Sequence, residues 1–274
     1  EESKKRGGSW MSVDLHCHIL PGIDDGAGDM ETSLEMLRIA EKDGIEHIIA
    51  TPHYIKGEID NGPSIVREKY EELKQALVNG NINVKVYPGN EVYISPDFPE
   101  LMEERLICPL NDTSYVLVEF PMATIPLYAA DVFYQLRLKG FNPILAHPER
   151  NGEIVGDPNI LFDLVQSGVL VQINAASLTG FYGRKVEETA WSLLRHGMAH
   201  FVATDAHSQG RRAPKLSESR KAVESEFGEA YAKRLYELNG LAVLSNERIE
   251  HTEPKKITKR KHFLFPSLSR FRTK

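Results

Sequence analysis

The chain has 274 residues, of which 41% are apolar and 26% charged, and this composition excludes a disordered or fibrous protein while providing enough apolar material for a large core. The formal net charge of -6 conceals an asymmetry, because residues 11–250 carry 22 Lys and Arg against 36 Asp and Glu, whereas residues 251–274 carry eight against one. The acidic body argues against nucleic-acid binding, which depends on a basic surface that neutralises phosphate charge.

Short β-branched or apolar runs alternate with amphipathic helical stretches, which is the pattern of repeated β-α units around a parallel sheet. The runs expected to be strands are residues 13–16, 47–51, 84–88, 115–119, 143–147, 169–173 and 200–204. The stretches expected to be helices are residues 30–43, 64–79, 97–105, 127–139, 158–167, 184–196 and 215–238. No linker interrupts this series, so the sequence predicts one barrel-like α/β domain.

The ends of the chain depart from this pattern. Residues 1–10 are expected to be a cloning remnant before Met11, residues 11–250 the single domain, and residues 251–274 a basic and aromatic tail. We expect a cytoplasmic protein, because the sequence has no run of about 18 apolar residues and no signal-peptide pattern. Two cysteines, Cys17 and Cys108, are too few for a disulfide framework and are expected to be free thiols.

Histidine and carboxylate side chains follow the expected strands. In a barrel of parallel strands the chemistry lies at the carboxyl ends of those strands, and six of the seven expected ends carry such residues. They are His16 and His18, Asp24 and Asp25, His53, Glu91, Glu119, His147 and Glu149, and Asp205 and His207. Because alternate side chains of an extended chain share a face, His16 and His18 are expected to point together, as are Asp205 and His207.

This set of side chains predicts a metal site. Imidazole and carboxylate suit Mn, Fe, Zn or Co, and the scarcity of thiolate argues against a structural zinc site. The number of candidate ligands exceeds what one tetrahedral ion uses, so we expect a cluster of ions, an arrangement that hydrolyses phosphate esters. An isolated HxH or DxH is a weak signal. His47, His196 and His200 lie at helix-to-strand junctions and are expected to be structural, and Cys17 is expected to be a packed thiol.

Six motifs, in their order and spacing, resemble the PHP (polymerase and histidinol phosphatase) superfamily: DLHCHILPGIDDGAGD, IIATPH, GNEV, VEFP, AHPER and ATDAH. The segments LPGIDDGAGD and AHPERN are similar to the manganese-dependent protein tyrosine phosphatases of Gram-positive bacteria, which act on bacterial tyrosine kinases that govern capsule and exopolysaccharide synthesis. The resemblance spans about residues 12–247 and implies a distorted, TIM-like (β/α)7 barrel.

The resemblance also implies three divalent metal ions, with Mn²⁺ expected and Fe, Zn or Co as alternatives. The implied ligands are His16, His18, Glu91 and Asp205 for the first ion, Glu91, Glu119 and His147 for the second, and Asp25, His53 and His207 for the third. The choice of Asp25 over Asp24 rests on the family pattern alone. The implied phosphate-binding residues are Arg150 and one of Arg211 and Arg212, with Arg212 favoured by its spacing.

We therefore expect hydrolysis of protein phosphotyrosine by a hydroxide activated at the metal cluster, with Arg150 and Arg212 holding the phosphoryl oxygens. The third ion or His207 is expected to assist departure of the tyrosine. A cysteine phosphatase is excluded, because it needs Arg at the sixth position after its nucleophile, and those positions hold Ile23 and Ser114. The alternatives are a phosphatase of small esters such as histidinol phosphate and a non-catalytic module that docks on a kinase.

The tail gives a separate prediction. Residues 255–274 combine eight Lys and Arg with five Phe and Leu side chains and contain no acid. This combination predicts peripheral contact with anionic lipid near a membrane-associated kinase. A solubilising disordered end is the alternative interpretation.

Overall fold

The computed structural model describes residues 11–250 and 253–258. Within these residues, nine parallel strands form two sheets, one in the order β1-β2-β4 and one in the order β3-β5-β6-β7-β8-β9. The strands are β1 (Ser12–Cys17), β2 (Ile45–Ala50), β3 (His53–Tyr54), β4 (Lys85–Pro88), β5 (Glu91–Tyr93), β6 (Tyr115–Glu119), β7 (Asn142–Ala146), β8 (Leu170–Asn174) and β9 (Phe201–Ala203).

The strands occupy seven positions around a ring. Two of these positions each contain two short strands, β2 with β3 and β4 with β5, which are separated by only two residues. The first strands of the two positions, β2 and β4, pair with each other, and so do the second strands, β3 and β5. The ring returns from β9 to β1 at their carboxyl ends, where a parallel bridge joins Cys17 to Ala206 and the His18 amide donates to the Ala206 carbonyl at 2.8 Å. The predicted α/β architecture of seven parallel strand positions is confirmed, and the change of sheet within two positions is its distortion.

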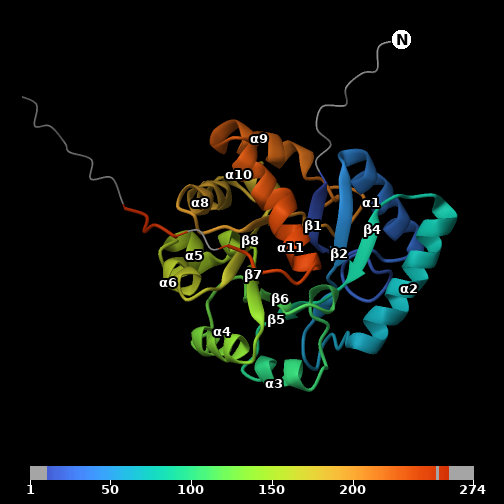
Figure 1. The fold of residues 1–274 in the computed structure, drawn as a ribbon, viewed down its shortest axis with the longest axis horizontal. Coiled ribbons are helices and arrows are strands. Elements are labelled where there is room, and N and C mark those ends of the chain that lie inside the picture. Colours follow the sequence, from blue (N-terminus) through green and yellow to red (C-terminus); the bar gives the residue numbers. More distant parts are fainter. Residues whose placement is uncertain (1–10, 251–252, 259–274) are drawn as a thin grey trace, which may run out of the picture.

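The helices cover the outside of the ring, apart from α11, which lies across its amino end (Figure 1), and α1 and α2 lie beside the three-stranded sheet. They are α1 (Met30–Asp43), α2 (Pro63–Gly80), α3 (Phe98–Glu103), α4 (Ala129–Leu138), α5 (Gly152–Gly156), α6 (Ile160–Gln166), α7 (Ala175–Leu178), α8 (Arg184–Arg195), α9 (Ser217–Phe227), α10 (Glu229–Lys233) and α11 (Asn239–Leu244). The short helical turns are η1 (Leu110–Asp112), η2 (Pro148–Arg150) and η3 (Arg234–Leu238).

The prediction of one helix over residues 215–238 is wrong. Gly228 has φ 85°, a left-handed conformation that ends α9 and starts a new helical segment, which continues through η3 and α11 to Leu244. The other predicted helices agree with the structure to within two residues at most ends. The short helices α5 and α7 follow β7 and β8 in places where the sequence predicts no helix.

The amino end of the ring is filled and closed. An inner apolar cluster includes Leu15, Ile49, Leu117 and Phe201, and Val243 of α11 packs in the same cluster. A methyl group on Gly240 would lie 2.6 Å from Cβ of Val13, so α11 sits in close contact with β1. Because side chains and α11 fill this end, the carboxyl ends of the strands are the place where polar side chains can gather.

The first residues of the predicted tail pack on the barrel. The Lys255 amide donates to the His196 carbonyl at 2.8 Å, and Ile257 exchanges two hydrogen bonds with the Asn159 side chain. Residues 259–274, which carry most of the predicted lipid contact, and residues 1–10 lie outside the described residues, so those predictions stay predictions. Each helix in the described part of the chain is too short or too polar to span a bilayer.

Candidate metal centre

An irregularity in β1 aims two histidines at the carboxyl end of the ring. Asp14 pairs with Ile48 and Cys17 with Ala50, so three steps along β1 match two along β2, which is a β-bulge. Leu15 consequently belongs to the inner cluster, while the side chain of the following residue, His16, meets His18, with 3.1 Å between their Nε2 atoms. Cys17 is fully buried, as predicted, in a second and larger apolar cluster that includes Met36 and Leu37 of α1.

Glu91 lies at the middle of the site. Its Oε2 is 3.2 Å from Nε2 of His16, 3.2 Å from Nε2 of His18 and 3.1 Å from Nδ1 of His53. Its Oε1 is 3.0 Å from Nε2 of His147. Glu91 is the first residue of β5, and the interruption after β4 brings it directly beside His53 at the start of β3. One carboxylate therefore joins imidazoles from four loops or strands, which is the arrangement expected of a bridging ligand.

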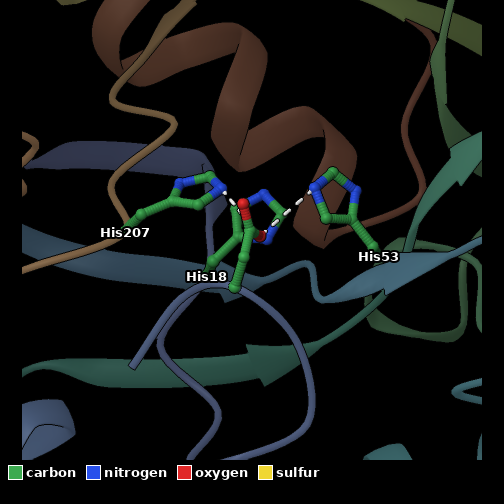
Figure 2. Close-up of side chains that lie close together, drawn as sticks. His18, His53 and His207 are labelled. Atoms are coloured by element: carbon green, nitrogen blue, oxygen red, sulfur yellow. Dashed lines mark ion pairs between the residues drawn. The ribbon is translucent and has the colours of Figure 1, made fainter. Parts of the chain in front are cut away.

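A second group of side chains adjoins His18. Figure 2 shows His18 between His53 and His207, with ring centroids 4.5 Å and 3.9 Å away. The Asp25 carboxylate Oδ1 is 3.5 Å from Nε2 of His53 and 3.3 Å from Nε2 of His207. Asp25, His53 and His207 thus lie together, as the family resemblance implies.

The adjacent Asp24 has a different position. Its Oδ2 accepts from Nδ1 of His18 at 2.7 Å and from the His53 amide at 3.1 Å, and its Oδ1 accepts from the Gly26 amide. A Cβ on Gly26 would lie 2.2 Å from the His18 carbonyl oxygen, so only glycine lets this loop fold back over His18. Asp24 thus lies behind His18 and bonds to the ring nitrogen that points away from the cluster, whereas Asp25 faces the cluster.

Glu119, His147 and Asp205 complete the set. Oε1 of Glu119 is 3.6 Å from Nε2 of His147, and Oδ1 of Asp205 is 3.5 Å from Nε2 of His16 and 3.4 Å from Nδ1 of His207. His147 and Asp205 have φ values of 31° and 51°, a left-handed backbone that non-glycine residues seldom adopt. Such strain persists where the surrounding structure enforces it, and functional sites are the usual location.

Two arginines lie at the rim of the cluster. Arg150 Nη1 donates to Oδ2 of Asp205 at 2.7 Å, and Arg212 Nη2 donates to Oδ1 of the same carboxylate at 2.8 Å. The guanidinium of Arg150 also stacks on the ring of Tyr182 at 4.5 Å. Arg211 points elsewhere and lies over the ring of Phe181 at 5.2 Å. Between the two arginines that the sequence leaves open, Arg212 is the one at the cluster.

The nitrogen and oxygen atoms of the cluster are arranged as ligands of divalent cations, and some of them make no hydrogen bond to one another. Oε2 of Glu91 and Nδ1 of His53 are buried and close to possible partners, yet neither makes a hydrogen bond of acceptable geometry among the described residues. Buried polar atoms that converge without hydrogen bonds are consistent with a shared cation as their partner. Three groups each have ligand atoms within 4.8 Å of one another: His18, Asp25, His53 and His207; His16, His18 and Glu91; and His53, Glu91 and Glu119.

These groups overlap the implied ligand sets without matching them fully. His53 lies near Glu91 and Glu119 as well as near Asp25, while His147 and Asp205 join through the ion pairs above. All nine implied ligands are connected in one cluster. Their division among ions stays a prediction.

The two carboxylates at the centre of the cluster have pKa values shifted in opposite directions. Burial and the neighbouring charge of Glu91 raise the pKa of Glu119 to about 7. Burial favours the protonated form of Glu91 as well, but His16, His147 and His18 outweigh it and hold the pKa of Glu91 well below its usual range. Bound cations would stabilise both carboxylates in their ionised form.

Residues that sequence reasoning missed lie on β8, the strand whose end carries no histidine or carboxylate. Gln172 and Asn174 are fully buried, and their side chains contact His16 and Asp205. The available signal was two polar residues alternating in an otherwise apolar strand. Tyr182 was also missed, because an aromatic residue in a loop gives no indication of which cation it stacks on.

The histidines expected to be structural make their hydrogen bonds outside the cluster, and Nδ1 of His200 accepts from the Val171 amide at 3.1 Å. Nδ1 of His47 hydrogen-bonds the Tyr87 hydroxyl at 2.9 Å, and Nδ1 of His196 bonds the Ser192 carbonyl at 2.8 Å.

Burial raises the pKa of the Cys108 thiol to about 11 and that of Cys17 well above its usual range. Neither thiol is therefore poised as a nucleophile.

Comparisons with solved structures agree on the fold. A prolidase structure only 10% identical in sequence superposes with a TM-score of 0.51, covering 89% of this chain and 76% of that one. At this level of identity the likeness concerns the fold alone.

Much more similar proteins place the chain in a family. Tyrosine-protein phosphatase YwqE of Bacillus subtilis (strain 168) is 41% identical over 253 residues, which cover 92% of this chain and 99% of that protein. Tyrosine-protein phosphatase CpsB of Streptococcus agalactiae serotype III (strain NEM316) is 26% identical, covering 86% of this chain and 100% of that protein.

A solved structure from the study of YwqE of Bacillus subtilis and CpsB of Streptococcus pneumoniae, described as unique metal-dependent tyrosine phosphatases, superposes with a TM-score of 0.87. It is 40% identical and covers 90% of this chain and 100% of that one. A family model described as "Capsular polysaccharide synthesis, CpsB/CapC" matches residues 12–245. The chain therefore belongs to the CpsB/CapC family of capsular polysaccharide synthesis.

Proposed function

We propose that this chain is a metal-dependent protein-tyrosine phosphatase that acts in the cytoplasm on a bacterial tyrosine kinase and related proteins and so regulates capsule or exopolysaccharide synthesis. The observation that carries the proposal is the convergence of five histidines and four carboxylates on one cluster, mostly buried but with Asp25 exposed, with Arg150 and Arg212 at its rim. Family membership supports the same activity.

Three divalent ions, with Mn²⁺ preferred, are the proposed cofactors. Their proposed ligands are His16, His18, Asp25, His53, Glu91, Glu119, His147, Asp205 and His207. When bound, such ions supply Lewis-acid charge and lower the pKa of a coordinated water toward neutrality. The chain itself positions the ligands, since the ring nitrogens and carboxylates converge in three overlapping groups.

The arginines bind the substrate phosphate in this proposal. A guanidinium presents several N–H groups in a plane that matches two phosphoryl oxygens. Nε of Arg212 is buried and has no hydrogen-bond partner among the described residues, so one N–H of this guanidinium is not committed to the protein. Asp205 and the Tyr182 ring together fix the Arg150 guanidinium. The tyrosine leaving group has a pKa near 10, so it needs less protonation than an alkoxide would, and in this proposal the third ion or His207 assists its departure.

Turnover of different phosphate esters tests this proposal. We expect rapid release of phosphate from a phosphotyrosine peptide, slow release from histidinol phosphate, and weak inhibition by orthovanadate, because no cysteine thiolate is involved. Phosphate release is measured with each substrate at the same Mn²⁺ concentration.

Two results would contradict the proposal. Faster hydrolysis of histidinol phosphate than of the peptide would favour the small-ester alternative. Absence of turnover with every ester from a protein that carries metal would favour the kinase-docking alternative.

A further inference from the structure

A chain of side-chain amides joins two proposed metal ligands that lie on different strands. Nδ1 of His16 is 2.9 Å from Oε1 of Gln172. Nε2 of Gln172 donates to Oδ1 of Asn174 at 2.7 Å, and Nδ2 of Asn174 donates to Oδ2 of Asp205 at 2.7 Å. Gln172 and Asn174 are both fully buried on β8. Three hydrogen bonds therefore link β1 to the end of β9 through β8.

The direction of this chain fixes which nitrogen of His16 faces the cluster. An amide oxygen only accepts hydrogen bonds, so Nδ1 of His16 carries the hydrogen and donates it to Gln172. In the neutral ring, Nε2 then has a free lone pair, and Nε2 is the atom that faces Glu91 and Asp205. Because Nε2 of Gln172 is engaged by Asn174, the glutamine amide has no freedom to turn its nitrogen toward His16.

The neighbouring histidine is held by a different kind of group. Nδ1 of His18 contacts the Asp24 carboxylate at 2.7 Å, whereas Nδ1 of His16 contacts a neutral amide oxygen at 2.9 Å. The two histidines of the HxH motif thus share an orientation, with Nε2 toward the cluster, but only the partner of His16 continues to the side chain of a second ligand, since Asp24 reaches His53 through its main-chain amide.

We infer that Gln172 and Asn174 are positioning residues that hold His16 in its Nδ1–H tautomer and tie it to Asp205, so that two ligands contributed by β1 and by the end of β9 are preset for one ion. The inference rests on the proposed metal centre. Partners that orient metal-bound histidines contribute roughly 10- to 100-fold to metal affinity.

Mn²⁺ binding by the purified, metal-stripped full chain tests the inference. Gln172→Leu removes the acceptor and the donor while keeping the side chain's approximate size, and we expect Mn²⁺ affinity to fall roughly 10- to 100-fold, as measured by calorimetric titration. Gln172→Glu keeps an acceptor for Nδ1 of His16 but loses the N–H that Asn174 accepts, so its affinity should lie between those of Gln172→Leu and the unaltered protein. Turnover at saturating Mn²⁺ should recover substantially in the Leu variant.

Asn239→Leu is the matched control. Asn239 is another buried amide, whose Nδ2 donates to the His200 carbonyl at 2.7 Å near the start of α11. Its replacement should lower stability but leave Mn²⁺ affinity unchanged. Equal Mn²⁺ affinities for a folded Gln172→Leu protein and the unaltered protein would overturn the inference.

A measurement without substitutions of Gln172 guards against misfolding of the variant. In the Zn²⁺-loaded protein with ¹⁵N-labelled histidine, the ring signal of His16, assigned by its loss in His16→Gln, should show a hydrogen on Nδ1 that exchanges slowly with water. A hydrogen on Nε2 instead would overturn the inference. A protein that binds Mn²⁺ normally but does not hydrolyse phosphotyrosine would contradict the proposed function alone, because binding and the tautomer decide this inference.

Discussion

Replacing Glu91 with Gln is expected to abolish turnover of a phosphotyrosine peptide and to leave the protein folded. The substitution keeps the shape of the side chain but removes the charge that faces His16, His18, His53 and His147 at 3.0–3.2 Å. A neutral amide bridges cations poorly, so both metal content and rate should fall, the rate by more than about 10²-fold. The apolar core is large and separate from the cluster, so folding should not depend on Glu91.

Steady-state phosphate release, metal content and thermal unfolding would be measured on the same preparation. Glu237→Gln serves as the control. Glu237 is a buried glutamate of η3 that pairs with Lys233 of α10, away from the cluster. Its turnover should stay near that of the unaltered protein. A Glu91→Gln variant with near-normal turnover would contradict the role of Glu91 as a bridge.

Arg150→Ala and Arg212→Ala are each expected to hydrolyse p-nitrophenyl phosphate roughly 10²-fold or more slowly than the unaltered protein. This is the order of magnitude for removing a positioned charge that stabilises a transition state. Guanidinium groups ligate no cation, so metal content should not change. Both guanidinium groups lie on the Asp205 carboxylate at 2.7–2.8 Å, next to the proposed ligands.

Arg211→Ala is the matched control for this pair. Arg211 is the next residue in the chain and has the same charge, but it stacks on Phe181 instead of facing the cluster. Its rate with p-nitrophenyl phosphate should stay within a few-fold of the unaltered protein. Severe loss in Arg211→Ala together with normal turnover in Arg212→Ala would show that the phosphate binds on the other side of this loop.

Much of the site was predictable because its chemistry repeats at the ends of strands. His16, His53, His147 and Asp205 each follow an apolar run, and parallel strands bring such ends to one edge. The interruptions of the strands could not be predicted from the sequence in the same way. The two-residue gaps that split the second and third strand positions, and the bulge in β1, arise from pairing with neighbouring strands.

Some roles depend on tertiary contacts that no local pattern encodes. Asp24 and Asp25 are adjacent and chemically identical, and only the folding of the loop against His18 separates their positions. Gln172 and Asn174 have no distinctive chemistry until His16 and Asp205 lie beside them. The helix predicted over residues 215–238 failed for the opposite reason, since its apolar periodicity continues across Gly228 while the backbone turns there.

Metal analysis combined with phosphotyrosine-peptide turnover on one preparation tests the central claim most directly. The protein is stripped with chelator and titrated with Mn²⁺, and bound metal per chain and rate are followed together. The account predicts that activity vanishes on stripping, returns with Mn²⁺ and approaches its maximum as about three ions bind per chain. Full turnover by a chain that contains no divalent ion would contradict it.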